Sequence, residues 1–268
     1  MNLFHLLDRS IVALLGLGFL LLASDCGACP DKPRSPEGAI RTIRKVELGV
    51  RHSSYRISTY LPILDAPAVK AETARWLRTE MKKVLRRERK MFLAAVADTV
   101  PLVMDGRLVH ATLENTCSVA VFSPDVISLR FDFELLFPRE NPIHTTRTLN
   151  LVLSTRQSIG LTDLFDTHAL ARAVSAIASY SQQELNRKLQ EDPYSVGMSK
   201  WISDGAAPLL SNFETFTVEK AGLRVIFEEY QVAAYVFGPQ EVLIPWKIMP
   251  EAHVGNAETR SVPCHARD

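Results

Sequence analysis

Alternating hydrophobic and polar residues are the dominant pattern of this chain. The clearest run covers residues 127–135, where apolar side chains at odd positions alternate with Ser, Arg, Asp and Glu. Strict alternation predicts a β-strand with one buried face and one solvent-facing face. The same pattern predicts further strands at residues 46–50, 55–61, 109–113, 117–122, 149–153 and 213–218.

Residues 223–246 predict a hairpin. Apolar residues alternate on both sides of a Gly238-Pro239 turn, at Leu223, Val225, Phe227, Val242, Ile244 and Trp246. Pro245 fits an edge strand or a strand end, because proline cannot donate a ladder hydrogen bond. The stretch predicts a fold element and no reaction, since no His, Cys or second acidic cluster accompanies its carboxylates, Glu228, Glu229 and Glu241.

Two segments have helical spacing. Apolar residues recur at three- and four-residue steps over residues 68–97 and again over residues 170–190, which predicts two long amphipathic helices. The first helix carries the densest positive run of the chain, Lys82, Lys83, Arg86, Arg87, Arg89 and Lys90. Two interpretations stay open: a docking face for an anionic glycan, a phospholipid or an acidic partner, and a solvated surface with ion pairs such as Glu80–Lys83.

These elements predict an α+β fold, with mainly antiparallel sheets packed against two long helices in two related or composite lobes. We expect an N-terminal lobe at residues 39–140, a C-terminal lobe at residues 141–250 and a flexible tail at residues 251–268. Residues 192–210 are mixed in character and predict a mobile loop, with Trp201 as a packing anchor.

The N-terminus has the pattern of an export signal. Residues 11–23 (IVALLGLGFLLLA) are apolar throughout, which is shorter than the roughly 20 residues of a membrane-spanning helix. We expect a signal or lipoprotein signal peptide at residues 1–25, a linker at residues 26–38, and a protein that is exported to the periplasm or anchored in the cell envelope. Acylation of Cys26, cleavage after Ala28 and an uncleaved anchor stay open.

Composition narrows the class of protein. The chain has 268 residues, 47% hydrophobic and 23% charged, which indicates a globular protein with a substantial core and excludes a multi-span membrane protein. A net charge of +1 lacks the basic excess of nucleic-acid-binding proteins. We therefore expect no nucleic-acid partner, and membrane association through the N-terminus only.

No motif identifies a catalytic, cofactor or metal site. The chain has no G-x-S-x-G, H-E-x-x-H or P-loop pattern, and a catalytic triad that meets only in the fold stays open. Four cysteines suit disulfides in an exported protein. We reject a zinc site built from Cys26, Cys29, Cys264 and His265, because these residues lie in terminal segments.

Two further residues, Cys117 and His168, have side chains of the kind that act in catalysis. We expect Cys117 to be a buried small hydrophobe rather than a nucleophile, because it lies in a predicted strand. We expect His168 to face solvent or to cap a helix, since nothing near it in the sequence would tune its pKa. We therefore expect no catalytic residue, no metal and no cofactor.

Several local motifs carry a family resemblance. They are the Tyr60-Leu61-Pro62 step before the first helix, LTDLF at residues 161–165, and Phe227-x-x-Tyr230-x-Val232-Ala233-x-Tyr235 followed by Gly238 and Ile244-Pro245. With these motifs, residues 55–92 and 148–246 resemble the paired domains of unknown function found in the extracellular region of the anti-sigma factor RsiV and in the peptidoglycan deacetylase PdaC. The second match is the more specific.

The resemblance implies an exported bacterial envelope protein that binds a partner rather than transforming it. In RsiV the corresponding region recognises lysozyme and gates proteolysis of the anti-sigma factor. Only ten residues precede Ile11 and no deacetylase domain follows, so we expect neither direct sigma-factor control nor glycan deacetylation. We expect a binding or sensor module for a lysozyme-like protein or a peptidoglycan fragment. An envelope hydrolase and a structural lipoprotein are the alternatives, and we expect Tyr230, Tyr235 and Gly238 to hold the hairpin onto the sheet.

Overall fold

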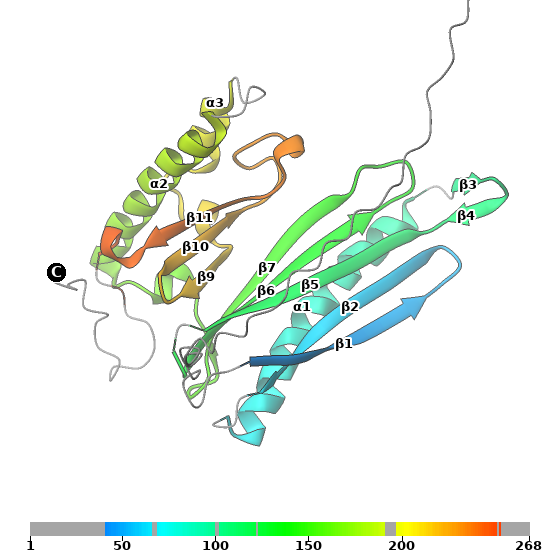
Figure 1. The fold of residues 1–268 in the computed structure, drawn as a ribbon, viewed down its shortest axis with the longest axis horizontal. Helices are drawn as coiled ribbons and strands as arrows, with labels where there is room; N and C mark the ends of the chain where they lie inside the picture. The colour runs from blue at the N-terminus through cyan, green and yellow to red at the C-terminus, as the bar shows by residue number, and fades with distance from the viewer. Residues whose placement is uncertain are drawn as a thin grey trace, which may run out of the picture. The chain divides into compact units, whose positions relative to one another are not determined.

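The computed structural model describes residues 41–65, 69–99, 102–121, 123–190, 197–250 and 252. Within these ranges the fold is mixed α+β, as expected, with eleven strands in three sheets and three α-helices (Figure 1). The expected signal peptide and linker, the expected tail apart from residue 252, and Cys26, Cys29, Cys264 and His265 lie outside the described residues. No helix in the described ranges is long and apolar enough to cross a membrane.

Six strands form the larger sheet, in the order β1-β2-β5-β6-β7-β8. Neighbours are antiparallel except β2 and β5, which run parallel because the chain crosses between them through α1 (Ala71–Ala97). The strands are β1 (Arg41–Arg51), β2 (Tyr55–Asp65), β5 (Ala111–Val121), β6 (Val126–Leu136), β7 (Ile143–Val152) and β8 (Gln157–Ser158). A separate two-stranded hairpin precedes β5 and consists of β3 (Leu102–Met104) and β4 (Arg107–Val109).

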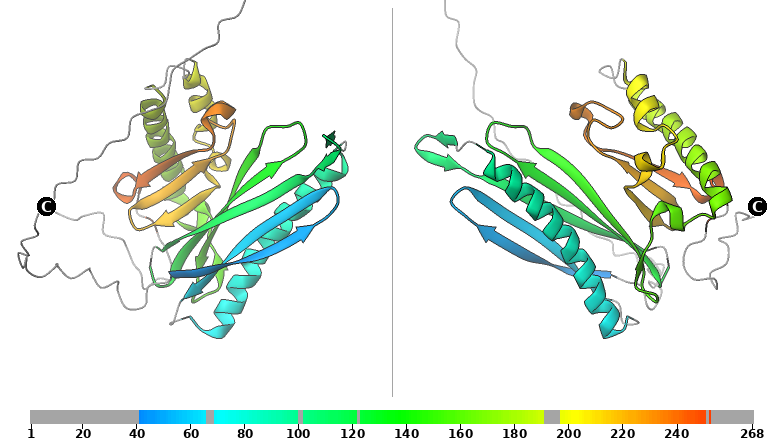
Figure 2. Two further views of the ribbon diagram at one scale, coloured as in Figure 1. Left: turned by 45° about the vertical axis from the view of Figure 1, so that its right-hand side comes forward. Right: turned by 180° about the vertical axis from the view of Figure 1, so that it is seen from behind.

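Helix α1 packs on one face of the larger sheet (Figure 2, right). Its buried residues are Thr73, Leu77, Met81, Leu85, Glu88 and Phe92. The odd-numbered residues of β6, from Ile127 to Leu135, lie in the same hydrophobic core. The intervening residues, among them Arg130, Asp132 and Glu134, therefore point to the opposite face. We call this second surface the polar face of the sheet.

A three-stranded antiparallel sheet follows, in the order β11-β10-β9. It consists of β9 (Phe216–Glu219), β10 (Gly222–Phe227) and β11 (Gln240–Pro245). Helix α2 (Thr167–Gln190) and the short helix α3 (Met198–Gly205) contribute to its hydrophobic core. Pro245 ends an edge strand, as its lack of an N–H predicts.

The hairpin prediction is confirmed in its pairing but wrong in its turn. Strands β10 and β11 pair antiparallel, yet residues 228–239 form a loop that includes a 3-10 helix at Tyr235–Phe237, rather than a tight turn at Gly238-Pro239. The chain leaves the sheet after Phe227 because the next two side chains bind β7. We call residues 228–239 the long loop.

Two other expectations differ from the structure. Residues 192–210, expected to be a loop, contain α3, whose eight residues are too few to show a clear helical period. Trp201, expected to be a packing anchor, is 37% exposed. Residues 140 and 141 lie in the turn between β6 and β7, which pair in one sheet, and the lobe boundary expected there stays a prediction. The hydrophobic side chains still divide into two cores, one with α1 and one with α2.

Candidate functional site

A groove opens between the polar face of the larger sheet and the long loop. Its volume is about 700 Å³, within the range of small-molecule sites. Charged and aromatic side chains line it, including Arg130, Asp132, Glu134, His144, Glu229, Tyr235 and Glu241. An adjoining hollow of about 550 Å³ shares His144, Glu229 and Tyr235 and extends to Tyr230. We refer to the two together as the groove.

Two carboxylates of the long loop cover the free edge of β7. The backbone N–H of His144 donates to Glu229 Oε2 (3.3 Å), and the N–H of Thr146 donates to Glu228 Oε1 (3.0 Å). Strand β8 pairs only with the last two residues of β7, so these N–H groups have no strand partner on that side within the described part of the chain. The carboxylate oxygens thus accept the hydrogen bonds that carbonyl groups of a neighbouring strand would otherwise accept. They also fix the long loop beside the polar face.

His144 lies between two carboxylates on the wall of the groove. Its Nδ1 is 2.6 Å from Glu229 Oε1, and its Nε2 is 3.4 Å from Glu134 Oε2. Burial lowers the pKa of His144, but the hydrogen bond and charge of Glu229, with those of Glu134, outweigh this and raise the pKa above its ordinary value. The sequence has no histidine beside Glu229, because this partner lies 85 positions away in the chain.

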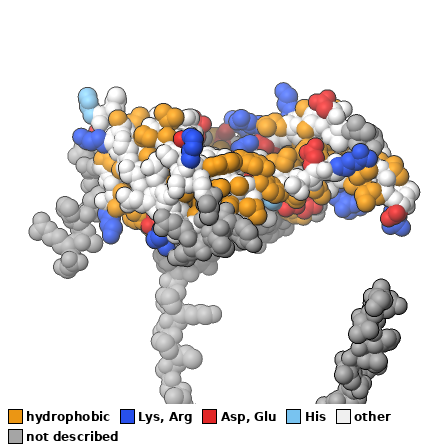
Figure 3. Space-filling view, turned by 90° about the horizontal axis from the view of Figure 1, so that it is seen from above, with side chains coloured by type: hydrophobic (Ala, Val, Ile, Leu, Met, Phe, Trp, Pro, Cys, Tyr) orange, Lys and Arg blue, Asp and Glu red, His pale blue; other side chains and the backbone are white. Residues whose placement is uncertain are grey.

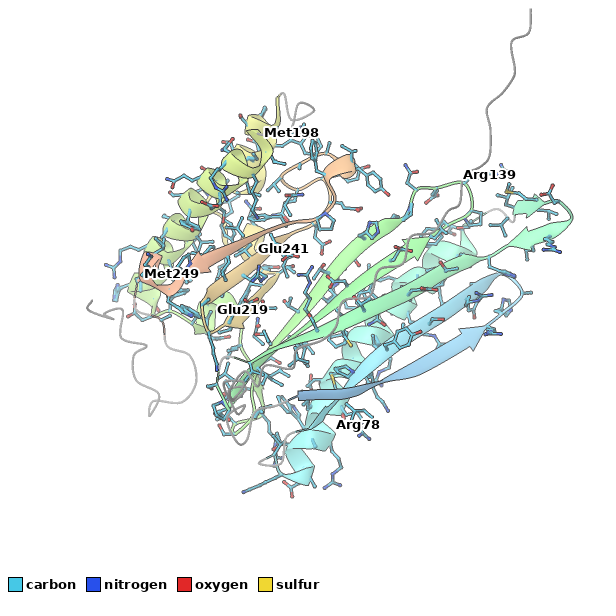
Figure 4. The ribbon with its side chains drawn as sticks, viewed as in Figure 1. Arg78, Arg139, Met198, Glu219, Glu241 and Met249 are labelled. Carbon is cyan, nitrogen blue, oxygen red and sulfur yellow. The ribbon has the colours of Figure 1, made fainter. Side chains whose placement is uncertain are left out.

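A second charged network joins β6 to the smaller sheet. Arg130 Nε lies 2.7 Å from Asp132 Oδ1, and Arg130 Nη1 lies 2.6 Å from Glu241 Oε1. Arg224 pairs with Glu219 at 2.6 Å and approaches the other oxygen of Glu241 at 3.7 Å. Figure 4 labels Glu241 on β11 and Glu219 on β9. These pairs hold charged groups of both sheets in fixed positions within and beside the groove.

Arg147 links the long loop to α1. Its Nε donates to Glu88 Oε1 at 2.7 Å, and its Nη1 donates to Glu228 Oε1 at 3.2 Å. Glu88 is only 1% exposed, so its charge depends on this partner. Burial raises the pKa of Glu228, and the hydrogen bond from Thr146 and the charge of Arg147 offset this only in part. Glu228 therefore holds a proton at a higher pH than an ordinary glutamate does.

Three aromatic side chains lie in a row that begins at the groove. The rings of Trp201 and Tyr230 lie 6.4 Å apart, and those of Tyr230 and Tyr235 stack at 5.9 Å between centroids. We call these three residues the aromatic row. The Tyr235 hydroxyl donates to the carbonyl of Pro142 at 2.7 Å, so Tyr235 does hold the long loop to the β6–β7 turn. Tyr230, by contrast, is 61% exposed.

Backbone geometry holds Tyr230 in this place. Its φ of +64° is a left-handed conformation that costs a non-glycine residue about 1 kcal/mol or more. A Cβ on Gly205 would lie 1.8 Å from the carbonyl oxygen of Gln231, so only glycine lets α3 approach the long loop this closely. The Gln231 amide donates to the carbonyls of Gly205 and Asn212, each at 3.0 Å. These contacts keep Tyr230 beside Trp201.

Hydrophobic and charged side chains are mixed on the surface around these elements. Figure 3 shows that hydrophobic side chains occupy much of the face seen from above, with acidic and basic side chains between them. Among large hydrophobic residues, Val236 of the long loop is 78% exposed. The surface near the groove can therefore make both apolar and polar contacts with a ligand.

The residues singled out for their chemistry in the sequence lie elsewhere. Cys117 is buried in the core of the larger sheet, as expected, and His168 is exposed near the start of α2. No group of three or more His, Cys, Asp or Glu side chains in the described part of the chain is arranged to hold a metal ion. What the groove offers is a set of fixed hydrogen-bonding and charged groups beside stacked aromatic rings.

The groove combines residues that the sequence pattern places on separate elements. The solvent-facing residues of β6 were visible as the polar half of an alternating strand, and Glu229 and Glu241 as carboxylates of the hairpin. Nothing local indicated that His144 of β7 lies between them. The only available signal was the polar composition of one strand face, which predicts exposure but no partner.

Two solved structures match most of the chain, and one family model matches its C-terminal part. No curated protein matches the chain in sequence. A solved structure of a DUF3298-family member from Bacteroides fragilis NCTC 9343 is 14% identical, with a TM-score of 0.47, over 85% of this chain and 94% of that one. A DUF3298-family protein from Pseudomonas aeruginosa PAO1 is 11% identical, with a TM-score of 0.48, over 79% of this chain and 92% of that one. Residues 162–247, which include the long loop and the smaller sheet, match the family model described as "Protein of unknown function (DUF3298)".

Proposed function

We propose that this protein is an exported binding module of the bacterial cell envelope and that its groove binds a fragment of cell-wall glycan. The observation that carries the proposal is the position of the exposed Tyr230 ring beside a groove lined by Glu134, His144 and Glu229. Export and the RsiV-like binding role come from the sequence pattern and the resemblance, and they form part of the proposal.

The groove has the two kinds of surface that a saccharide needs. One face of a pyranose ring is apolar and packs well on an aromatic ring, and the stacked pair Tyr230–Tyr235 offers such a surface. The hydroxyl and acetamido groups at the rim of the sugar need hydrogen-bond acceptors. The side chain of Glu134 is 54% exposed, so its carboxylate oxygens can accept such bonds.

The pairing of the charged groups supports binding rather than turnover. His144 already contacts two carboxylates, and Arg130 also contacts two. A hydrolase would need a carboxyl group or an imidazole that exchanges a proton with the substrate in the groove. Fixed ion pairs instead hold the shape of a site before the ligand arrives, which lowers the entropic cost of binding.

A basic, lysozyme-like protein is the second candidate ligand. The side chains of Asp132 and Glu134 are 37% and 54% exposed at the groove. Exposed carboxylates beside aromatic side chains favour a cationic protein surface. This candidate differs from the glycan in its response to salt, because attraction between exposed charges is screened at high ionic strength.

The test is a titration of residues 38–268 with a soluble disaccharide-peptide from peptidoglycan, followed by tyrosine and tryptophan fluorescence. We expect saturable binding that weakens about five-fold in Tyr230→Ala, since a stacked aromatic contact contributes about 1 kcal/mol. Val103→Ala is the matched control, because Val103 is 62% exposed on the separate β3–β4 hairpin.

Further outcomes separate the alternatives. Release of shortened glycan during the titration would identify a hydrolase and overturn the binding proposal. Salt-sensitive binding of lysozyme without binding of the disaccharide-peptide would favour the protein ligand. Absence of binding to both ligands would contradict both candidate functions.

A further inference from the structure

Helix α1 presents a dense row of positive charge on the side that faces away from the larger sheet. Its 27 residues include eight basic and three acidic side chains, although the whole chain has a net charge of only +1. All eight basic residues are exposed, namely Arg75, Arg78, Lys82, Lys83, Arg86, Arg87, Arg89 and Lys90. Figure 4 labels Arg78 on this helix.

The acidic residues of α1 do not neutralise this row. Glu72 pairs with Arg156 at 2.6 Å, and Glu88 is buried against Arg147. Glu80 pairs with Lys83 at 2.8 Å, which confirms the ion pair expected from the sequence. The other seven cations have no ion-pair partner among the described residues. A solvated helix face would be expected to carry interspersed charges of both signs.

We propose that the exposed face of α1 docks on an anionic phospholipid membrane. The cations from Arg75 to Lys90 extend over about 23 Å of the helix, which suits an extended flat surface better than a small ligand. The predicted export signal at residues 11–23 directs the chain to a membrane, which favours lipid headgroups over a soluble anionic polymer as the source of negative charge. This inference does not rest on the glycan site.

The contact between α1 and the membrane depends on electrostatic attraction rather than on insertion into the bilayer. Among large hydrophobic residues of α1, Met91 is exposed, at 49%, so the helix has little apolar surface to bury in the acyl region. Each basic side chain near an anionic surface strengthens binding roughly five-fold. Attraction of this kind weakens as salt shortens the Debye length from about 10 Å at 0.1 M to about 3 Å at 1 M.

The groove remains accessible in this orientation. Helix α1 covers the apolar face of the larger sheet, whereas Arg130, Asp132 and Glu134 line the groove from the polar face. The basic row points away from the sheet on the side of α1. A membrane bound to α1 therefore lies on the opposite side of the sheet from the groove.

Vesicle sedimentation tests the proposal. Residues Gly38–Asp268 form one compact unit apart from Met1–Glu37, so this unit can be used without the apolar N-terminal run. The probes are vesicles of phosphatidylglycerol and phosphatidylcholine in equal parts, and vesicles of phosphatidylcholine alone. We expect binding to the first only, and its loss at high salt.

Charge-neutralising variants locate the binding face. The variant Lys82→Gln/Arg86→Gln/Arg89→Gln should bind on the order of a hundred-fold more weakly. A second variant, Arg75→Gln/Arg78→Gln/Lys90→Gln, should show a similar loss. The control variant Arg172→Gln/Lys220→Gln/Lys247→Gln removes three exposed cations elsewhere and should bind as the parent does.

Four outcomes would overturn the proposal. They are absence of binding to phosphatidylglycerol vesicles, equal binding to phosphatidylcholine vesicles, an equal loss in the control variant, and retention on soluble dextran sulfate without vesicle binding. The last outcome would identify an anionic polymer as the partner of α1.

Discussion

Ser128 and Asn150 lie opposite each other on β6 and β7, and together they tie the larger sheet to β9. The Ser128 hydroxyl donates to Asn150 Oδ1 at 2.5 Å and accepts from the N–H of Val218 at 2.8 Å. The Asn150 amide donates to the carbonyl of Phe216 at 3.1 Å. Both side chains are buried, so each bond is strong and each missing partner is costly.

Replacing Asn150 should weaken the link between the sheets. We expect Asn150→Ala to lower the free energy of unfolding by about 2 kcal/mol, because the Phe216 carbonyl then loses its buried donor and the Ser128 hydroxyl can donate only to the Val218 carbonyl, at 3.3 Å. Urea unfolding followed by circular dichroism measures this loss. Asn141→Ala, at an exposed position of the β6–β7 turn, should change the value by less than about 0.5 kcal/mol. A loss below about 1 kcal/mol in Asn150→Ala would contradict this role.

The buried carboxylate of Glu88 should make Arg147 essential to stability. We expect Arg147→Met to lower the free energy of unfolding by about 3 kcal/mol, because a buried charge without its partner is strongly destabilising. The side chain of Arg147 is 28% exposed, so we expect a loss at the lower end of the roughly 3–5 kcal/mol that breaking a buried ion pair costs. The double variant Glu88→Met/Arg147→Met should recover most of the loss. If the two single losses simply add in the double variant, the residues do not act as a pair.

His144 should make stability depend on pH. A histidine whose pKa is raised in the folded state stabilises the fold below its unfolded pKa of about 6.5. That contribution disappears as pH rises through the folded pKa. We therefore expect the stability difference between the parent and His144→Gln to be full in mild acid and to shrink with rising pH. Urea titrations at several pH values test this, and a difference that is constant with pH would exclude the proposed ion pairs with Glu134 and Glu229.

Tyr230 should support binding more than stability. In Tyr230→Gly, relief of the left-handed backbone stabilises the fold by about 1 kcal/mol, while loss of the stacked ring costs about 0.5–1.5 kcal/mol. We expect the free energy of unfolding to change by less than about 1 kcal/mol and glycan affinity to fall about five-fold. Thermal unfolding and the fluorescence titration measure the two effects. If the variant is largely unfolded but its remaining folded fraction binds the glycan as tightly as the parent does, Tyr230 supports stability rather than binding.

Local pattern was sufficient for most elements of the fold. The alternation over residues 127–135 predicts both the strand β6 and its buried side, because side chains of a strand alternate between faces. Helices α1 and α2 were likewise expected, because each spans several turns of regular apolar spacing. The long loop was missed because its course depends on Glu228 and Glu229 binding β7, a contact that no local rule contains.

Much less of the candidate site than of the fold could be predicted from the sequence. Glu229 and His144 are both ordinary surface residues by pattern, and only the packing of the long loop against β7 brings them together. Tyr230 was expected to support the scaffold, since aromatic residues in a hairpin usually do so. Its exposure follows from its positive φ, which sequence periodicity does not predict for a tyrosine.

Because its residues alternate strictly, β6 supplies side chains to both the groove and the hydrophobic core. Odd positions fill the core with α1, and even positions supply Arg130, Asp132 and Glu134 to the groove. Gain or loss of a single residue within the strand would exchange the two sets, because every later side chain would change faces. Substitution at even positions can therefore change the lining of the groove and leave the core intact, whereas a change in the length of β6 would alter the groove and the core together.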